Sequence, residues 1–193
     1  MDMRKKMKTT FEYKTKRLIV RFYKAGDFKE WKRAHSHIES KKNVWDMDPI
    51  PLEDVQKLKA HFKSVLEFHK SELKNERGYH FAVFLKRNNN LVATASLMDI
   101  SRGIFNNAYV GYRILNNYWS MGYGNEILDA LTKIAFKELS LHRIEAGIEP
   151  NNIRSIGLVK KLGFRKEGRS KKRLFVRDEW RDLMIYALTV EDL

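Results

Sequence analysis

Between residues 80 and 139 the chain changes its hydrophobic period, and this change constrains the fold more than any other feature. Segments 80–85, 91–100 and 108–115 are rich in β-forming residues and are separated by three asparagines and by a loop. Asparagine tolerates left-handed backbone angles, so we expect an antiparallel three-stranded unit. Apolar residues then recur at helical spacing over 123–139, which predicts an amphipathic helix. A helix between two sheet strands indicates a mixed sheet with one crossover.

Further elements flank this unit. The expected strands are 17–22, 143–148, one that starts at Phe164, and 182–188, and the expected helices are 26–38, 52–74 and 152–162. The sum is a mixed α/β fold of the α+β type, with a central, mostly antiparallel sheet of about seven strands flanked by about four helices. The sequence contains no linker rich in Pro, Gly or Ser and no internal repeat, so we expect a single domain over 1–193.

Composition excludes several classes of protein. The chain has no cysteine, which excludes disulfides, thiolate nucleophiles and zinc ribbons and fits a reducing cytoplasm. Apolar residues make up 43% and aromatic residues 12%, so the chain is not a disordered one. No apolar run reaches the length of a membrane span, and the basic N-terminal stretch has no apolar region behind it, so we expect neither a membrane segment nor a secretory signal.

The charge is concentrated at the two ends of the chain. The formal net charge is +14, with nine basic and two acidic residues in 1–24 and eleven basic and three acidic residues in 154–181. Such an excess favours a polyanionic partner such as RNA, a ribosome or a phosphorylated cofactor. A solvated, solubilising surface explains the same pattern, and both interpretations stay open.

A Gly-x-Gly turn joins the third strand of the central unit to the helix. Gly122 and Gly124 let the backbone approach an anion, and the free N–H groups and dipole of the helix N-terminus favour one. The pattern is neither a dinucleotide-binding fingerprint nor a P-loop, since Ile127 stands where the third glycine would be and no Gly-Lys-Ser/Thr follows. An ordinary tight turn is the alternative.

Other short motifs lie before and after this turn along the chain. They are Gly111-Tyr112, Trp119 with Gly122, Gly124 and Glu126, Arg143 to Ala146, Pro150 with Asn152 and Ser155, Lys161 to Gly168, and Trp180 with Asp182. Together they resemble the GNAT acetyltransferase superfamily, and within it the RimJ/RimL-like N-acetyltransferases. The resemblance covers most of the chain and is strongest from Val110 to Asp182.

The resemblance implies acetyl-CoA as the acetyl donor. It implies that the turn 119–125 holds the pyrophosphate through backbone N–H groups, that strand 112–114 pairs with the pantetheine amides, and that Asn152 and Ser155 meet the thiol end. Lys161 is expected either at a cofactor phosphate or in solvent. The expected cofactor-binding residues are Tyr112, Arg113, Ile114, Trp119, Ser120, Met121, Gly122, Tyr123, Gly124, Asn125, Asn152, Ser155 and Lys161.

Two positions depart from the family pattern. Met121 stands where a basic residue or Gln is common, which removes one phosphate contact and leaves backbone donation intact. Val159 stands where many GNAT enzymes carry a tyrosine that acts as general acid, so the acid is left unassigned.

The reaction needs a base, because a protonated amine has no lone pair with which to attack the thioester. The expected catalytic residues are Glu145 as base, with Asp99 and Glu149 as less favoured bases, and Ser155 as a proton relay to the thiolate. Capping of the helix near 152 is the alternative role of Ser155. Glu126, in the first turn of a helix, is interpreted as structural.

No metal is expected. The six histidines are dispersed, and the helix predicted over 26–38 would point the close pair His35 and His37 to different sides. Segment 37–51, which includes Trp45, is the expected wall of the acceptor pocket.

The sequence therefore predicts an acetyl-CoA-dependent N-acetyltransferase that acts on a protein N-terminus, with a ribosomal protein favoured by the subfamily. One alternative is an enzyme that acetylates a small amine such as a polyamine, an amino sugar or an antibiotic, and another is a non-catalytic CoA- or RNA-binding adaptor. A monomer or homodimer is expected.

Overall fold

The computed structural model describes residues 11–39, 54–176 and 178–193. The strands are β1 (Glu12–Lys14), β2 (Leu18–Arg21), β3 (Tyr79–Leu85), β4 (Leu91–Ser101), β5 (Asn107–Ile114), β6 (Arg143–Ile148), β7 (Arg165–Val176) and β8 (Glu179–Thr189). The α-helices are α1 (Phe28–Ser36), α2 (Val55–Lys74), α3 (Tyr123–Lys133) and α4 (Ile153–Lys161). A π-helical turn, Ile134–Glu138, extends α3, and short 3₁₀ turns lie at Ala25–Asp27, Asn116–Tyr118 and Val190–Asp192.

All eight strands form one sheet in the order β1-β2-β3-β4-β5-β6-β8-β7. Every neighbouring pair is antiparallel except β5 and β6, which are parallel and are joined by the crossover through α3. The mixed α/β fold and the four helices are confirmed within the described residues. The sheet has one strand more than expected, because β1 adds a short edge strand against β2.

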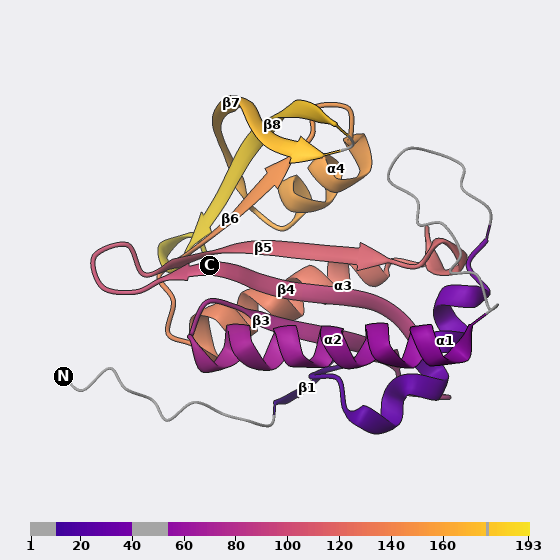
Figure 1. Ribbon diagram of the computed structural model, residues 1–193. Coiled ribbons are helices and arrows are strands. Elements are labelled where there is room, and N and C mark those ends of the chain that lie inside the picture. Colours follow the sequence, from indigo (N-terminus) through magenta and orange to yellow (C-terminus); the bar gives the residue numbers. More distant parts are fainter. Residues whose placement is uncertain (1–10, 40–53, 177) are drawn as a thin grey trace.

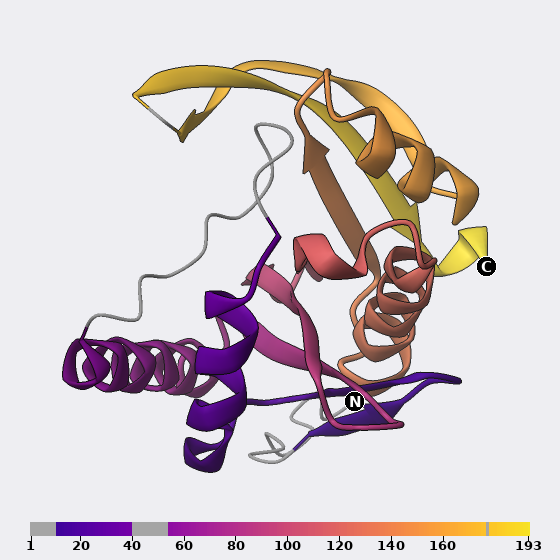
Figure 2. The ribbon, with the colours of Figure 1, turned by 90° about the vertical axis from the view of Figure 1, so that its right-hand side faces the viewer.

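Helices cover both faces of the sheet. Figure 2 shows α1 and α2 on one side of the sheet and α3 and α4 on the other. The larger core lies under α3, where Ile127, Leu131 and Ile144 are fully buried with side chains of β2 to β6. The smaller core packs Trp31 and Phe62 of α1 and α2 against the opposite face. The apolar side chains that recur at helical spacing therefore face the sheet, as the sequence predicts.

Two predicted features lie partly or wholly outside the described residues. The helix predicted over 52–74 is described from Val55, and most of segment 37–51 falls among residues that are not described. The single domain over 1–193 stays a prediction. No helix in the described ranges combines the length and the apolar character that a membrane crossing requires.

Candidate functional site

The parallel pair β5–β6 comes apart after three residue pairs. Asn107, Ala108 and Tyr109 pair with 143–145, whereas β5 continues to Ile114 and the two strands then diverge (Figure 1). Beyond Tyr109 the β6-facing edge of β5 has no strand partner among the described residues. Its backbone groups are thus open to pairing with an extended ligand.

A cavity of about 190 Å³ lies in this divergence. It is lined by residues 110–112 of β5, by residues 146–149 of β6, and by Asn152, Ser155 and Val159 at α4, with Leu174 and Leu183 from the β7–β8 hairpin. The motifs that the sequence places on β5, β6 and α4 therefore meet in one hollow.

The turn into α3 has the geometry that the glycine motif predicts. Gly122 is the N-terminal cap of α3 and has a φ of 74°, in the left-handed region that favours glycine. Within residues 11–39, 54–176 and 178–193 no side chain caps this helix end, so the structure shows no side-chain acceptor for its first N–H groups. The indole N–H of Trp119 donates to the Ile114 carbonyl at 2.9 Å and ties the turn to the end of β5. Since this bond occupies the Ile114 carbonyl, the open edge of β5 lies at 110–113.

Arg17 fixes the turn from a distant part of the chain. Its guanidinium donates to the Met121 carbonyl at 2.9 Å and to the Glu126 carboxylate at 2.7 Å, and it lies over the Tyr123 ring. Glu126 also accepts hydrogen bonds from the Arg17 backbone N–H and the Thr15 hydroxyl. Partial burial alone would raise the pKa of Glu126, but these hydrogen bonds hold it below the ordinary value. Glu126 is thus structural, as expected.

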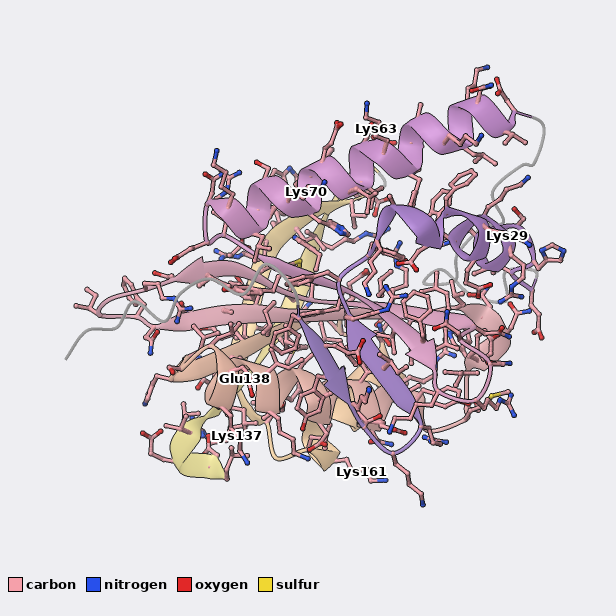
Figure 3. The ribbon with its side chains drawn as sticks, turned by 90° about the horizontal axis from the view of Figure 1, so that it is seen from below. Lys29, Lys63, Lys70, Lys137, Glu138 and Lys161 are labelled. Atoms are coloured by element: carbon pink, nitrogen blue, oxygen red, sulfur yellow. The ribbon has the colours of Figure 1, made fainter. Side chains whose placement is uncertain are left out.

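Two further cationic side chains, those of Arg154 and Lys161, lie at different places relative to the turn. The guanidinium of Arg154 lies 4.0 Å from the centre of the Trp119 ring, beside the turn. Lys161, at the end of α4, is exposed and points away from the sheet (Figure 3). The predicted phosphate contact of Lys161 stays a prediction.

Ser155 enters the cavity from the first turn of α4. The cap of this helix is Asn152, whose Oδ1 accepts from the Ser155 backbone N–H at 3.2 Å, so the alternative in which Ser155 is the cap is wrong. The Ser155 hydroxyl is instead the acceptor for the Tyr112 hydroxyl at 3.3 Å. Burial raises the pKa of Tyr112, with the hydrogen bond to Ser155 opposing that effect.

The three carboxylates considered as bases lie in different places. Glu149 lines the cavity at the end of β6. Glu145 does not line the cavity; its carboxylate accepts from Arg143 Nε at 2.9 Å and from Asn107 Nδ2 at 3.2 Å. Asp99 is exposed on β4 with a φ of 50° and does not line the cavity either. Ser155 and Glu149 thus line the same cavity, and Glu145 does not.

A second hollow, of about 260 Å³, adjoins the first. Glu149 lines both, and the second is otherwise lined by Pro150, Asn151, Arg169 and residues 179–182. The ion pair of Arg169 with Asp182 spans 2.7 Å in its wall. A bulky acceptor could therefore reach Glu149 from this side of the β7–β8 hairpin.

Among the described residues, no three His, Asp or Glu side chains gather closely enough to hold a metal ion. His35 and His37 each bond to the backbone carbonyl four residues earlier in α1, at 2.8 and 2.9 Å from Trp31 and Arg33.

Comparison with known proteins agrees with this geometry. A family model described as acetyltransferase (GNAT) domain matches residues 17–165. The probable N-acetyltransferase YjcK of Bacillus subtilis (strain 168) is 32% identical over 143 residues, which cover 74% of this chain and 78% of that protein. The ribosomal protein uS5-alanine N-acetyltransferase of Escherichia coli (strain K12) is 30% identical over 181 residues, covering 92% of this chain and 90% of that protein.

A solved structure shares the fold. Mycobacterium smegmatis RimJ, in complex with CoA-disulfide, superposes with a TM-score of 0.75 at 24% identity and covers 91% of this chain and 83% of that one. The fold and the family match define an acyl-transferring enzyme that acts on amines. The chain belongs to the GNAT family of acetyltransferases and is an acetyl-CoA-dependent N-acetyltransferase, not a non-catalytic adaptor.

Sequence reasoning misses two contributors to this site. Arg17 lies 109 positions from Glu126, and no local pattern signals their pairing. The Tyr112 hydroxyl is also missed, because the strand motif implicates only the backbone of Tyr112. The sequence offers one indication of it: Val159 replaces the tyrosine of many GNAT enzymes, and this replacement could prompt a search for another hydroxyl.

Proposed function

We propose that the chain transfers the acetyl group of acetyl-CoA to the α-amine of a protein N-terminus. The observation that carries this proposal is the cavity at the β5–β6 divergence, where Glu149 and Ser155 line one hollow beside the turn at the start of α3. The full-length similarity to an enzyme named for acetylation of an alanine on ribosomal protein uS5 supports this acceptor class.

The cofactor would extend from the turn to the cavity. Backbone N–H groups of 119–125 would receive the pyrophosphate at the start of α3, with Arg154 as a nearby cation. The open edge of β5 over 110–113 would pair with the pantetheine amides, which would bring the thioester between Glu149 and Ser155.

The chemistry is direct attack of the amine on the thioester carbon. We assign the base to Glu149, which takes a proton from the ammonium and leaves the nitrogen with a lone pair. The C–N bond forms and the C–S bond breaks with its electron pair on sulfur. The amide nitrogen releases its second proton to water, Ser155 gives its hydroxyl proton to the sulfur, and water returns the proton released by the nitrogen to Ser155. An α-amine, with a pKa of about 7.7–8.0, loses its proton far more readily than a lysine near 10.4.

The assignment of Glu149 as the base is tested by the same substitution, Glu to Gln, at two positions along β6 and its continuation. Glu149→Gln should lower kcat by about 100-fold, the usual size of a lost general base, while the affinity for CoA is unchanged. Glu145→Gln is the matched variant and should leave kcat close to that of the wild type. If Glu145 were the base, Glu145→Gln would lower kcat and Glu149→Gln would not. Wild-type kcat for Glu149→Gln between pH 6 and 9 would refute the assignment.

The class of acceptor is tested by comparing turnover on different substrates. Acetyl-CoA is first titrated into the protein by calorimetry, with CoA and ATP as comparisons. Turnover is then measured on peptides with a free N-terminal Ala or Ser, on the same peptides with a blocked N-terminus and an internal lysine, and on spermidine. We expect turnover on the free N-termini. A preference for spermidine would favour the small-amine alternative, against which the net charge of +14 argues.

We further propose that β7 contacts RNA near the acceptor, in the cytoplasm. Lys166, Lys171 and Lys172 are exposed on this edge strand and form no ion pair within the described ranges. Phe175 and Trp180 are also exposed, with ring centres 5.3 Å apart, and can stack on bases. Edge-strand lysines also deter aggregation, so the surface needs a direct test.

That test is the salt dependence of binding to a labelled single-stranded RNA, followed by fluorescence anisotropy. Binding should weaken steeply with salt, and Lys171→Gln with Lys172→Gln should reduce the slope by about 0.7 for each phosphate that the two lysines neutralise. Lys70→Gln on α2 is the control, because Lys70 lies on another side of the molecule (Figure 3). A slope equal to that of the wild type in the double variant would exclude β7 as the RNA-binding strand.

A further inference from the structure

The cavity contains a hydroxyl pair that links the two sides of the divergence. Tyr112 stands on β5 and Ser155 in the first turn of α4, 43 positions apart, and the Tyr112 hydroxyl donates to Ser155 Oγ at 3.3 Å. Both residues line the cavity. Asn152 holds the Ser155 backbone N–H at 3.2 Å, which fixes the serine in the capped turn. The pair is therefore anchored by a strand at one end and by a helix start at the other.

The direction of this hydrogen bond fixes where the serine proton points. A serine hydroxyl has one proton to donate and two lone pairs that accept. The Tyr112 phenol is the donor in this contact, and burial raises its pKa against the weaker opposing effect of Ser155, so the phenol keeps its proton at neutral pH. Ser155 Oγ is then the acceptor in this contact, and its own proton must point to another group.

The wall of the cavity restricts what that other group can be. Next to the pair the lining is apolar at Ala146, Ile148 and Val159. Val159 occupies the helix position at which many GNAT enzymes carry a tyrosine, so its side chain brings no hydroxyl into the cavity. The polar side chains that line the cavity with the pair are Asn152, whose Oδ1 already accepts from the Ser155 backbone N–H, and Glu149, so a ligand atom in the hollow can receive the serine proton.

We propose that Tyr112 is a positioning residue that directs the Ser155 O–H at the sulfur of the bound CoA. This inference rests on the proposed function, because it requires the thiol end of the cofactor in this cavity. As the C–S bond breaks, the sulfur takes the electron pair and receives the proton of Ser155. The bond from Tyr112 stabilises the charge that develops on Ser155 Oγ until water carries to it the second proton that the amide nitrogen releases.

A hydrogen bond to the thiolate lowers the pKa of the bound CoA thiol, and this quantity can be measured without any acceptor. CoA itself is the probe: its thiolate absorbs in the ultraviolet, so the bound thiol is titrated on the wild type, Tyr112→Phe, Ser155→Ala and the double variant. We expect Ser155→Ala to raise the pKa of the bound thiol by about one, a tenfold loss of thiolate preference, and Tyr112→Phe to raise it by a part of that amount. In the double variant Tyr112→Phe should add nothing to Ser155→Ala.

Tyr109→Phe is the matched control, since it removes a phenol hydroxyl from the same strand. That hydroxyl contacts Arg173 at 3.4 Å, and Tyr109 does not line the cavity. The control should leave the thiol pKa and the affinity for CoA as in the wild type. A thermal melt of each variant identifies any that fails to fold, and Tyr112→Leu then replaces Tyr112→Phe.

The outcomes separate this inference from the function on which it rests. If CoA does not bind the wild type, the proposed cofactor site fails. If CoA binds and Ser155→Ala leaves the thiol pKa unchanged, the role of Ser155 fails. If Ser155→Ala raises the thiol pKa but Tyr112→Phe does not, or if the two effects add in the double variant, the positioning role of Tyr112 is overturned. An effect of Tyr112→Phe that disappears in the Ser155→Ala background supports it.

Discussion

Two stacked imidazoles on the α1–α2 side of the sheet should make stability fall in mild acid. The rings of His69 on α2 and His80 on β3 lie 4.6 Å apart with their planes 10° from parallel, and Tyr23 stacks on His69. His69 Nδ1 and His80 Nε2 are buried without a hydrogen-bond partner among the described residues. Burial, aided by repulsion from His80, lowers the pKa of His69 to about 4. Burial also lowers the pKa of His80, although Glu72 opposes it.

The direction of this pH dependence follows from the protons that His69 binds in the folded and unfolded states. Between pH 6.5 and about 4 the unfolded His69 binds a proton that the folded one does not, so the free energy of unfolding rises with pH in this window. Lowering the pH from 7 to 5 would remove up to about 2 kcal/mol if the full difference in pKa acted. Because His69 is only partly buried, solvent screening reduces the expected loss to about 1 kcal/mol.

The assay is urea unfolding of the wild type and of His69→Phe at pH 7 and pH 5, where most carboxylates are still ionised. Phenylalanine keeps a flat ring against His80 and cannot titrate. The drop in free energy of unfolding between the two pH values should be smaller by about 1 kcal/mol in His69→Phe than in the wild type. His37→Gln, which removes an exposed imidazole at the C-terminal cap of α1, is the control variant. Equal drops in the wild type and His69→Phe would refute the reasoning.

Three further substitutions address the turn and the core beneath it. Gly122→Val should weaken CoA binding about tenfold in calorimetry, because a left-handed backbone costs a residue with a side chain about 1–2 kcal/mol; an unchanged affinity would remove the turn from the cofactor site. Glu126→Gln should lower the free energy of unfolding by about 1–3 kcal/mol at pH 7, since Thr15 and Arg17 both donate to the carboxylate. That deficit should shrink as the pH falls below 4.5, where the wild-type carboxylate, whose folded pKa is lowered, takes up its own proton. Ile127→Ala should lower the free energy of unfolding by about 2–5 kcal/mol in urea, because Ile127 is fully buried in the larger core.

Most of the sheet could be predicted because its strands carry their own signal. Segments such as Tyr79–Leu85 and Leu91–Ser101 are buried along much of their length, so their β-forming residues stand out from the sequence. The strand Glu12–Lys14 has no such signal. Its three residues, a glutamate, a tyrosine and a lysine, become a strand only through pairing with β2, which is a tertiary contact.

The choice between Glu145 and Glu149 as base could not be made from the sequence, for a geometric reason. Glu145 and Glu149 both lie at odd positions along the run of β6 and its continuation, so strand alternation cannot separate them. What separates them is the register of β6 on β5. Glu145 pairs with Tyr109, the last residue pair before the strands diverge, and Glu149 follows where they are apart. A divergence of this kind has no signature in the local sequence of either strand.

The same strand, β5, determines both halves of the site. At its end the Ile114 carbonyl accepts the Trp119 indole N–H and so fixes the turn at the start of α3. Two residues earlier the Tyr112 hydroxyl donates to Ser155 in the cavity that we propose holds the thioester. If the cofactor binds as proposed, the rise of one short, paired segment of strand sets the spacing between its phosphates at the turn and its thioester in the cavity. Because β4 pairs with this segment through Ala93 and Ala95, small residues buried in the sheet, larger side chains there should displace β5 and impair cofactor binding and turnover together.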